Sequence, residues 1–262
     1  MGSQAVISSS YFSCLSFVAL NSFQARLPIK LSVLPLHANA KPTSHHLLKF
    51  QRLKTRATLD EKEQNAPNPL LIQEQEEEEK MQARSNLVEK SVKVLKNAAK
   101  TRKVAKDEVL SAMSVIEKAK IDPSGFLDTL GGSESPGRTW MLVFTAEKQL
   151  KGGRYFPLTA VQRFDAAGKR IENGVYLGPI GCLTFEGRFT WKKRILAFIF
   201  ERIRIKIGPL NPLEISLGQK EDREPNTKDP FFIWFYIDEE IAVARGRSGG
   251  TAFWCRCHRV TT

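Results

Sequence analysis

Two neighbouring segments of the chain alternate between apolar and polar residues in the way that is typical of β-strands. Residues 182–191 place apolar side chains at every second position, and residues 195–207 begin apolar and end with isoleucines that alternate with basic residues. A basic turn at residues 192–194 separates them, which predicts a hairpin. If that turn has two residues, a bulge near Glu201 is needed to bring the isoleucines of the second strand inward. In either register the basic residues of this strand lie on its outer face.

The same kind of pattern continues from Arg138 to the end of the chain. Short apolar segments are separated there by Gly, Pro, Asn and Asp, which predicts about eight or nine antiparallel strands. That number of strands is typical of a closed barrel or a sandwich, so the fold class is mainly β. We assign residues 137–262 to this β domain.

The segment before the β domain has a helical pattern. Residues 81–120 contain no Gly or Pro, and their apolar residues recur at steps of three and four, which predicts helix with one apolar stripe. Arg102 and Lys106 interrupt the stripe, so two helices are supported as well as one. The stripe suits either a coiled-coil partner or packing across the following domain, and its short alanine-rich seam favours packing. We expect the helical segment to cover residues 81–130.

Charge is distributed unevenly along this chain, whose net charge is +12. Residues 1–59 contain no Asp or Glu, seven Lys or Arg and nine Ser, a composition typical of an organelle transit peptide. The high Ser content favours a plastid over a mitochondrion, so we expect residues 1–57 to be a chloroplast transit peptide, with a disordered basic tail as the alternative. Residues 58–80 are acidic and predict a disordered linker, or else an acidic docking tail.

The remaining positive charge belongs to the β domain. Residues 137–262 hold 21 Lys and Arg against 13 Asp and Glu. Six of these cations lie in two clusters on the predicted hairpin, where they could face an anionic membrane. Keeping the sheet soluble and protecting an edge strand would explain them equally well. The candidate membrane-surface residues are Lys192, Lys193, Arg194, Arg202, Arg204 and Lys206.

Three segments of the β domain form an ordered set of motifs. Residues 137–145, GRTWMLVFT, place a Trp before aliphatic residues, an aromatic residue and Thr. Residues 235–246, FYIDEEIAVARG, lead from an acidic turn into a strand that ends in Arg-Gly, and residues 248–253, SGGTAF, lead through a Gly turn into the last strand. Together these segments resemble the plastid-lipid-associated protein (fibrillin) family over about residues 137–259.

The resemblance implies a lipocalin-like antiparallel β-barrel, here preceded by the helical segment. It also implies a chloroplast protein at thylakoids or plastoglobules that binds or organises prenyl lipids, carotenoids, quinones or other hydrophobic molecules. Inward-facing side chains of such a barrel would line a ligand cavity, and Arg245 with Gly246 would close the barrel end. The candidate cavity residues are Trp140, Leu183, Phe185, Phe189, Trp191, Ile203, Ile205, Ile207, Tyr236 and Phe253.

The sequence contains no evident catalytic or metal-binding motif. His258 is the only histidine outside the predicted leader, and there is no phosphate-binding loop or nucleophile elbow. Cys255 and Cys257 share one face of a strand while His258 takes the other, so the three do not converge on a metal unless the strand breaks. The two cysteines are simplest as small buried apolar residues, with redox pairing left open. We therefore expect a non-enzymatic protein without metal or cofactor.

The sequence supports two functions. The first is a plastid protein that holds a hydrophobic lipid or pigment and attaches peripherally to a thylakoid or plastoglobule surface. The alternative is a chloroplast assembly or scaffold factor with a filled barrel, which would bind a protein partner through residues 81–120. Nucleic acid is a poor fit because the basic residues alternate with buried ones and are not interleaved with exposed aromatic residues.

Overall fold

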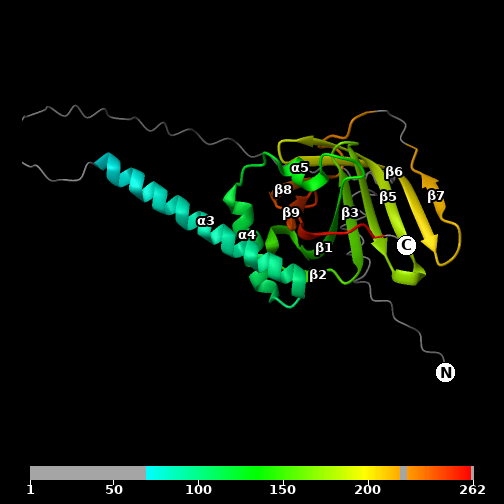
Figure 1. The fold of residues 1–262 in the computed structure, drawn as a ribbon, viewed down its shortest axis with the longest axis horizontal. Coiled ribbons are helices and arrows are strands. Elements are labelled where there is room, and N and C mark those ends of the chain that lie inside the picture. The colour runs from blue at the N-terminus through cyan, green and yellow to red at the C-terminus, as the bar shows by residue number, and fades with distance from the viewer. Residues whose placement is uncertain (1–68, 219–222, 261–262) are drawn as a thin grey trace, which may run out of the picture. The chain divides into compact units, whose positions relative to one another are not determined.

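The computed structural model describes residues 69–218 and 223–260 (Figure 1). The predicted leader, residues 1–57, and the first part of the predicted linker, residues 58–68, lie outside this range. The elements are α3 Pro69–Thr101, α4 Lys106–Ala119, α5 Phe126–Gly131, β1 Arg138–Ala146, η2 Lys148–Leu150, β2 Gly153–Tyr155, β3 Thr159–Asp165, β4 Arg170–Tyr176, η3 Gly178–Ile180, β5 Gly181–Lys192, β6 Ile195–Ile207, β7 Leu213–Ser216, β8 Phe231–Ile237, β9 Ile241–Gly246 and β10 Thr251–Cys257.

Eight of the strands close into an antiparallel barrel. The ring runs β1-β3-β4-β5-β6-β8-β9-β10, and β10 pairs back with β1 from Thr139↔Cys257 to Ala146↔Thr251. Two short strands lie outside the ring, β2 on β1 and β7 on β6. Closure gives every ring strand two neighbours and decides between the two arrangements that the strand pattern allowed, in favour of the barrel.

The hairpin of β5 and β6 has the bulged form that a two-residue turn requires. Lys192 pairs with Ile195, which leaves two residues in the turn. Glu186 pairs with Arg202 and Gly187 with Phe200, so Glu201 is the extra residue in β6. Because a bulge shifts the alternation by one, the inward positions of β6 change parity there. The inward apolar residues of β6 are Leu196, Phe198 and Phe200 before the bulge, and Ile203 and Ile205 after it.

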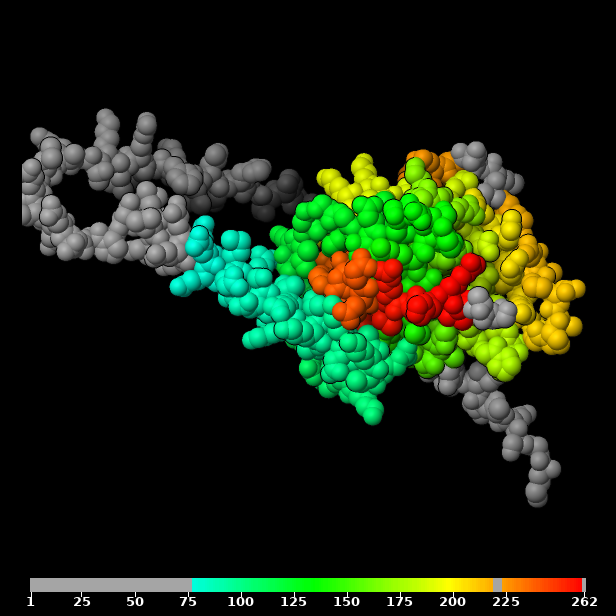
Figure 2. Space-filling model, viewed as in Figure 1, coloured from blue at the N-terminus to red at the C-terminus, as the bar shows by residue number. Residues whose placement is uncertain are grey.

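The helical stripe packs on the outside of the barrel (Figures 1 and 2). Its buried residues are Val92, Leu95 and Ala98 of α3 and Val109, Ala112, Met113 and Ile116 of α4. They lie against the outer faces of β1, β8, β9 and β10. Of the two uses predicted for the stripe, the structure therefore shows packing across the β domain. Helix α3 ends at Thr101, and the next residue, Arg102, has a φ of 53°. No helix in the described part of the chain combines the length and apolar character needed to cross a bilayer.

Helix α3 begins earlier than the sequence analysis predicts. It starts at Pro69, so residues 69–80 are helical where we expected a disordered linker. Proline is tolerated in the first turn of a helix because its missing N–H would have had no partner there. The Glu, Gln and Lys residues that follow have good helix propensity, which outweighed the acidic composition on which the linker prediction rested.

The short helix α5 lies at one end of the barrel. Its Phe126 and Leu130 belong to the interior cluster of the barrel. The Trp140 indole N–H donates to the Leu130 carbonyl at 2.7 Å, and Arg138 donates to the Thr129 carbonyl at 2.9 Å. These bonds place α5 at the end where β1 begins, which is also the end of the β5–β6 turn.

Candidate ligand site inside the barrel

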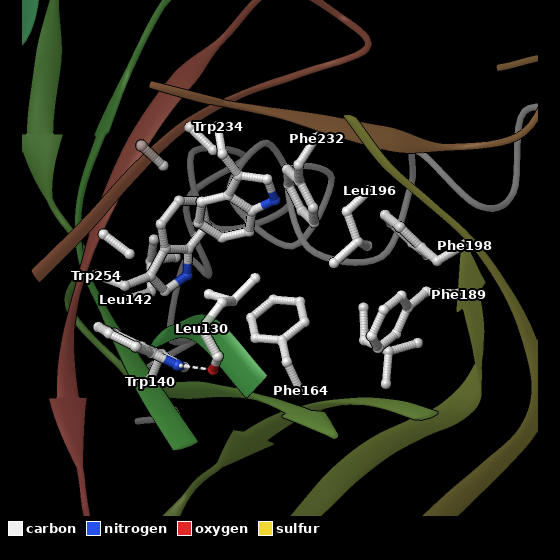
Figure 3. Close-up of a cluster of buried hydrophobic side chains, with 14 of the residues drawn as sticks. Leu130, Trp140, Leu142, Phe164, Phe189, Leu196, Phe198, Phe232, Trp234 and Trp254 are labelled. Carbon is white, nitrogen blue, oxygen red and sulfur yellow. Dashed lines mark hydrogen bonds between the residues drawn. The ribbon is translucent and has the colours of Figure 1, made fainter. Parts of the chain in front are cut away.

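Aromatic side chains form a connected cluster in the barrel interior (Figure 3). Trp234 and Trp254 lie side by side with ring centroids 5.4 Å apart, and Phe232 contacts both indoles. Phe164 packs edge-on against Trp234 at 5.6 Å, and Phe198 stacks on Phe232 at 5.3 Å. The interior is therefore filled mainly by large rings that contact one another and bury much apolar surface per residue.

Seven of the ten candidate cavity residues lie at this interior. Four are buried within the cluster: Trp140, Phe185, Phe189 and Ile203. Three are partly buried and pack against it: Leu183, Trp191 and Ile205. Their inward position agrees with the predicted alternation, and Phe189 is only 2% exposed.

The prediction is wrong for Ile207, Tyr236 and Phe253. Ile207 ends β6 and is 60% exposed. Tyr236 follows a bulge between Trp234 and itself, which turns its side chain toward the helices. Phe253 is buried in the outer cluster, because the adjacent Trp254 takes the inward position on β10.

Two interior amide side chains were not predicted from the sequence. Gln162 of β3 is 4% exposed and Asn173 of β4 is 1% exposed, and the two are cross-strand partners. Gln162 alternates with Ala160 and Phe164, while Asn173 alternates with Ile171 and Val175, and all four of these apolar residues lie in the interior cluster. The alternation of apolar positions along β3 and β4 therefore places both amides on the inward face.

Several interior polar atoms have no hydrogen-bond partner in the described part of the chain. They are Gln162 Oε1, Asn173 Oδ1, Asn173 Nδ2, Trp234 Nε1 and Trp254 Nε1. A buried polar group left without a partner costs about 1–3 kcal/mol, so most such groups in proteins are satisfied. Here both acceptors and donors are left without partners in an aromatic interior. None of these groups titrates near neutral pH, so the arrangement suits an uncharged molecule with a carbonyl or hydroxyl group.

The six candidate membrane-surface residues do not form one surface. Lys192, Lys193 and Arg194 lie at the α5 end, whereas Lys206 lies near the opposite end of β6. Lys192 and Lys193 are exposed, but Arg194 donates to the Ile121 carbonyl at 3.1 Å. Together with Trp191, both Lys193 and Arg194 line a pocket of about 510 Å³ beside the segment that leads into α5.

Two of the outer-face arginines are paired. Arg204 contacts Glu214 of β7 at 2.5 Å, and Arg202 lies 3.7 Å from the same carboxylate. Hydrogen bonding from Arg204 and its charge lower the pKa of Glu214. This pairing joins the neighbouring strands β6 and β7, and it reduces the net charge that the predicted basic face presents.

Arg245 and Gly246 lie where β9 ends, but they do not close the barrel. Closure is made by the backbone pairing of β1 with β10. The Arg245 guanidinium lies 5.2 Å from the centre of the Phe235 ring and pairs with Glu117 of α4. The pairing with Glu117 helps to hold α4 against the barrel. Gly246 donates its N–H to the Gly250 carbonyl at 2.9 Å in the turn before β10.

The cysteines near the chain end are poorly suited to react. Burial raises the pKa of Cys255, and burial together with the neighbouring Cys255 raises the pKa of Cys257 to about 11. Both stay protonated at neutral pH, although the thiolate is the reactive and metal-binding form. Within the described residues, no three His, Cys, Asp or Glu side chains come close enough together to hold a metal ion.

A second pocket, of about 370 Å³, opens beside the end of β10 and is rich in arginine. Its charges are partly compensated, because Arg138 and Arg256 both pair with Glu239. Arg163 pairs with Glu172 at 2.5 Å and donates to the Pro136 carbonyl at 2.9 Å. These contacts hold the chain around Pro136 against β3.

The fold and its interior define a closed eight-stranded antiparallel β-barrel with an aromatic core that contains unpartnered polar atoms. No protein-family model matches the chain, and no curated protein matches it. Function is therefore inferred from the residues themselves.

Proposed function

We propose that the barrel binds a single uncharged, largely apolar molecule that carries a carbonyl or hydroxyl group. The observation that carries the proposal is the set of unpartnered amide and indole atoms on Gln162, Asn173, Trp234 and Trp254 inside an aromatic interior. A ligand oxygen could accept from the indole N–H groups or the Asn173 amide, and a ligand hydroxyl could donate to Gln162 Oε1. Such bonds would remove the cost of burying these atoms alone.

Prenyl quinones, prenyl lipids and oxygenated carotenoids have this combination of a long apolar body and a few oxygens. The acid-free, Ser-rich residues 1–59 support a chloroplast location, and the motif resemblance supports a peripheral lipid-associated protein at thylakoids or plastoglobules. In this proposal the protein stores or presents the molecule and does not transform it.

Binding of a prenyl quinone can be measured by quenching of tryptophan fluorescence, because Trp140, Trp234 and Trp254 line the interior. We expect saturable quenching by the quinone. The double substitution Gln162→Leu with Asn173→Leu should weaken quinone binding by about tenfold or more, since it removes hydrogen bonds to the ligand oxygens. Unfolding measurements should show that this variant is at least as stable as the wild type, because three unpartnered amide atoms are lost.

An isoprenoid hydrocarbon without oxygen is the matched control. It should bind the wild type and the double variant equally, because it has no group for the amides to recognise. If the quinone does not quench saturably, and protein purified from chloroplasts carries no extractable lipid or pigment, the proposal fails.

A further inference from the structure

Six large aliphatic side chains are exposed at the barrel end opposite α5. They are Leu177 at 45%, Ile180 at 68%, Ile207 at 60%, Leu210 at 64%, Leu213 at 59% and Ile215 at 41% exposure. The other exposed large apolar residues of the described chain are Met81 and Leu87, both on α3. A gathering of exposed apolar side chains marks an interaction site more often than scattered single ones do.

Backbone contacts bring these six residues together. Ile207 pairs with Gly181, and the Gly208 N–H donates to the Ile180 carbonyl at 2.8 Å. The Leu210 N–H donates to the Ile207 carbonyl at 3.1 Å. The β4–β5 connection, the end of β6 and strand β7 therefore form one structure, which we call the apolar lip and define as residues 177–180 and 207–215.

The apolar lip continues the lining of the barrel. Strand β6 pairs with β8 only over Ile195–Ala197, and further along it pairs with β7 instead. Leu213 is the partner of Ile205 and Ile215 is the partner of Ile203, so all four side chains share one face of the sheet. Because Ile203 and Ile205 belong to the interior surface, an apolar face extends from the barrel interior to the exposed lip. In Figures 1 and 2 the gold and orange segment that includes β7 lies at the outer edge of the barrel.

Basic side chains lie on the opposite face of the same strands. Arg202, Arg204 and Lys206 alternate with the inward isoleucines, and Glu214 compensates part of their charge. Lys206 forms no ion pair within the described residues and is partly exposed. Exposed aliphatic residues next to cations are typical of protein segments that lie at the boundary between lipid head groups and acyl chains.

We propose that the apolar lip docks on a lipid surface with anionic head groups. Ile180, Ile207, Leu210 and Leu213 enter the acyl boundary, and Lys206 and Arg204 face the head groups. A lipid partner fits better than a protein partner because the exposed residues are all aliphatic, whereas protein interfaces are centred on Trp, Tyr and Arg. The proposal does not require that the barrel holds a ligand.

Vesicle sedimentation tests the proposal with the full chain and mixed phosphatidylcholine and phosphatidylglycerol vesicles. The wild type should bind, and binding should weaken as salt rises. Leu210→Ser with Leu213→Ser should reduce vesicle binding by about tenfold or more, because the variant lacks two aliphatic side chains whose transfer from water into the lipid favours binding. As a matched control, Met81→Ser with Leu87→Ser removes exposed apolar residues from α3 and should bind like the wild type.

A fluorescence change on vesicle binding provides a second test. With Leu210→Trp, vesicles should shift the fluorescence emission to shorter wavelength, whereas the same substitution at Leu87 should produce no shift. Equal vesicle binding by the wild type and the Leu210→Ser, Leu213→Ser variant would overturn the proposal. It would also be overturned if the wild type does not bind vesicles but forms a dimer that the same substitutions disrupt. If the wild type binds vesicles but not the quinone, only the function proposed above is rejected. If it binds the quinone but not vesicles, only the docking of the apolar lip on lipid is rejected.

Discussion

At the scale of single residues, Asp238 connects helix α3 with the turn between β8 and β9. It accepts hydrogen bonds from the backbone N–H groups of Glu240 and Ile241, both at 2.8 Å, and from the Tyr236 hydroxyl at 2.9 Å. Lys96 of α3 forms an ion pair with it at 2.9 Å. Burial by itself would raise the pKa of Asp238, but these hydrogen bonds outweigh burial and lower the pKa below its ordinary value of 3.8.

The lowered pKa predicts how stability depends on pH. The contribution of Asp238 is fully present above its ordinary pKa of 3.8 and is lost as pH falls through the lower folded value. Asp238→Asn should therefore reduce stability at neutral pH and flatten the loss of stability toward acid. Urea denaturation from about pH 6 to about pH 3 measures both effects. Glu134→Gln alters an exposed carboxylate and should keep the wild-type profile; an Asp238→Asn profile parallel to the wild type would contradict the assignment.

At the scale of elements, the β5–β6 hairpin depends on a glycine opposite its bulge. A Cβ atom on Gly187 would lie 1.9 Å from the Ile199 carbonyl oxygen and 2.8 Å from the Phe200 Cα. Both are backbone atoms, so the strands would have to separate to admit it. The bulge residue Glu201 is held by Arg170 at 2.7 Å and Arg188 at 2.8 Å, which leaves the hairpin little freedom to adjust.

Gly187→Ala should accordingly lower the free energy of unfolding by about 1–3 kcal/mol, as overpacking usually does. Gly152→Ala is the matched control, since its nearest neighbour is the Glu147 side chain at an ordinary 3.5 Å. That change should be neutral or slightly stabilising, because alanine restricts the unfolded chain. Urea denaturation of both variants provides the comparison, and equal stability of the two would refute the close approach of the strands.

At the scale of the whole molecule, two apolar clusters share the same strands. The interior cluster takes Trp140, Trp234 and Trp254 from β1, β8 and β10, and the outer cluster takes Val143, Phe235 and Phe253 from those strands. Helices α3 and α4 complete the outer cluster. Separation of the helices would expose one full face of these strands, so we expect helices and barrel to unfold together.

A substitution in α4 tests this coupling. Met113 is fully buried in the outer cluster, and Met113→Ala should lower the free energy of unfolding by about 2–5 kcal/mol. Helical circular dichroism and the fluorescence of the interior tryptophans should shift together. The exposed Ser111→Ala on the same helix should have little effect on either signal. Loss of the helical signal before the fluorescence change would show that the helices are a separate folding unit.

Local periodicity was sufficient for much of the architecture. The strand pattern predicted an antiparallel barrel or sandwich, the β5–β6 hairpin with its bulge as one of two possible registers, and the apolar stripe of α3 and α4, because each depends on residues close together in the chain. For the same reason the inward positions of β5 and of the end of β6 were predictable as far as Ile205. The amides of Gln162 and Asn173 followed the same rule and could have been found.

Only the tertiary structure decided which side chains of β8 and β10 face inward. Both faces of these strands are buried, one in the barrel and one under the helices, so their sequences are apolar at nearly every position and lose the alternation that identifies a face. Tyr236 and Phe253 were misplaced for that reason. The contact of Arg245 with Glu117 of α4 and the contact of Ile180 with the end of β6 likewise depend on how segments far apart in the chain meet. Sequence by itself thus determined the elements and most of their faces, while closure of the ring determined which of those faces are covered and which remain exposed.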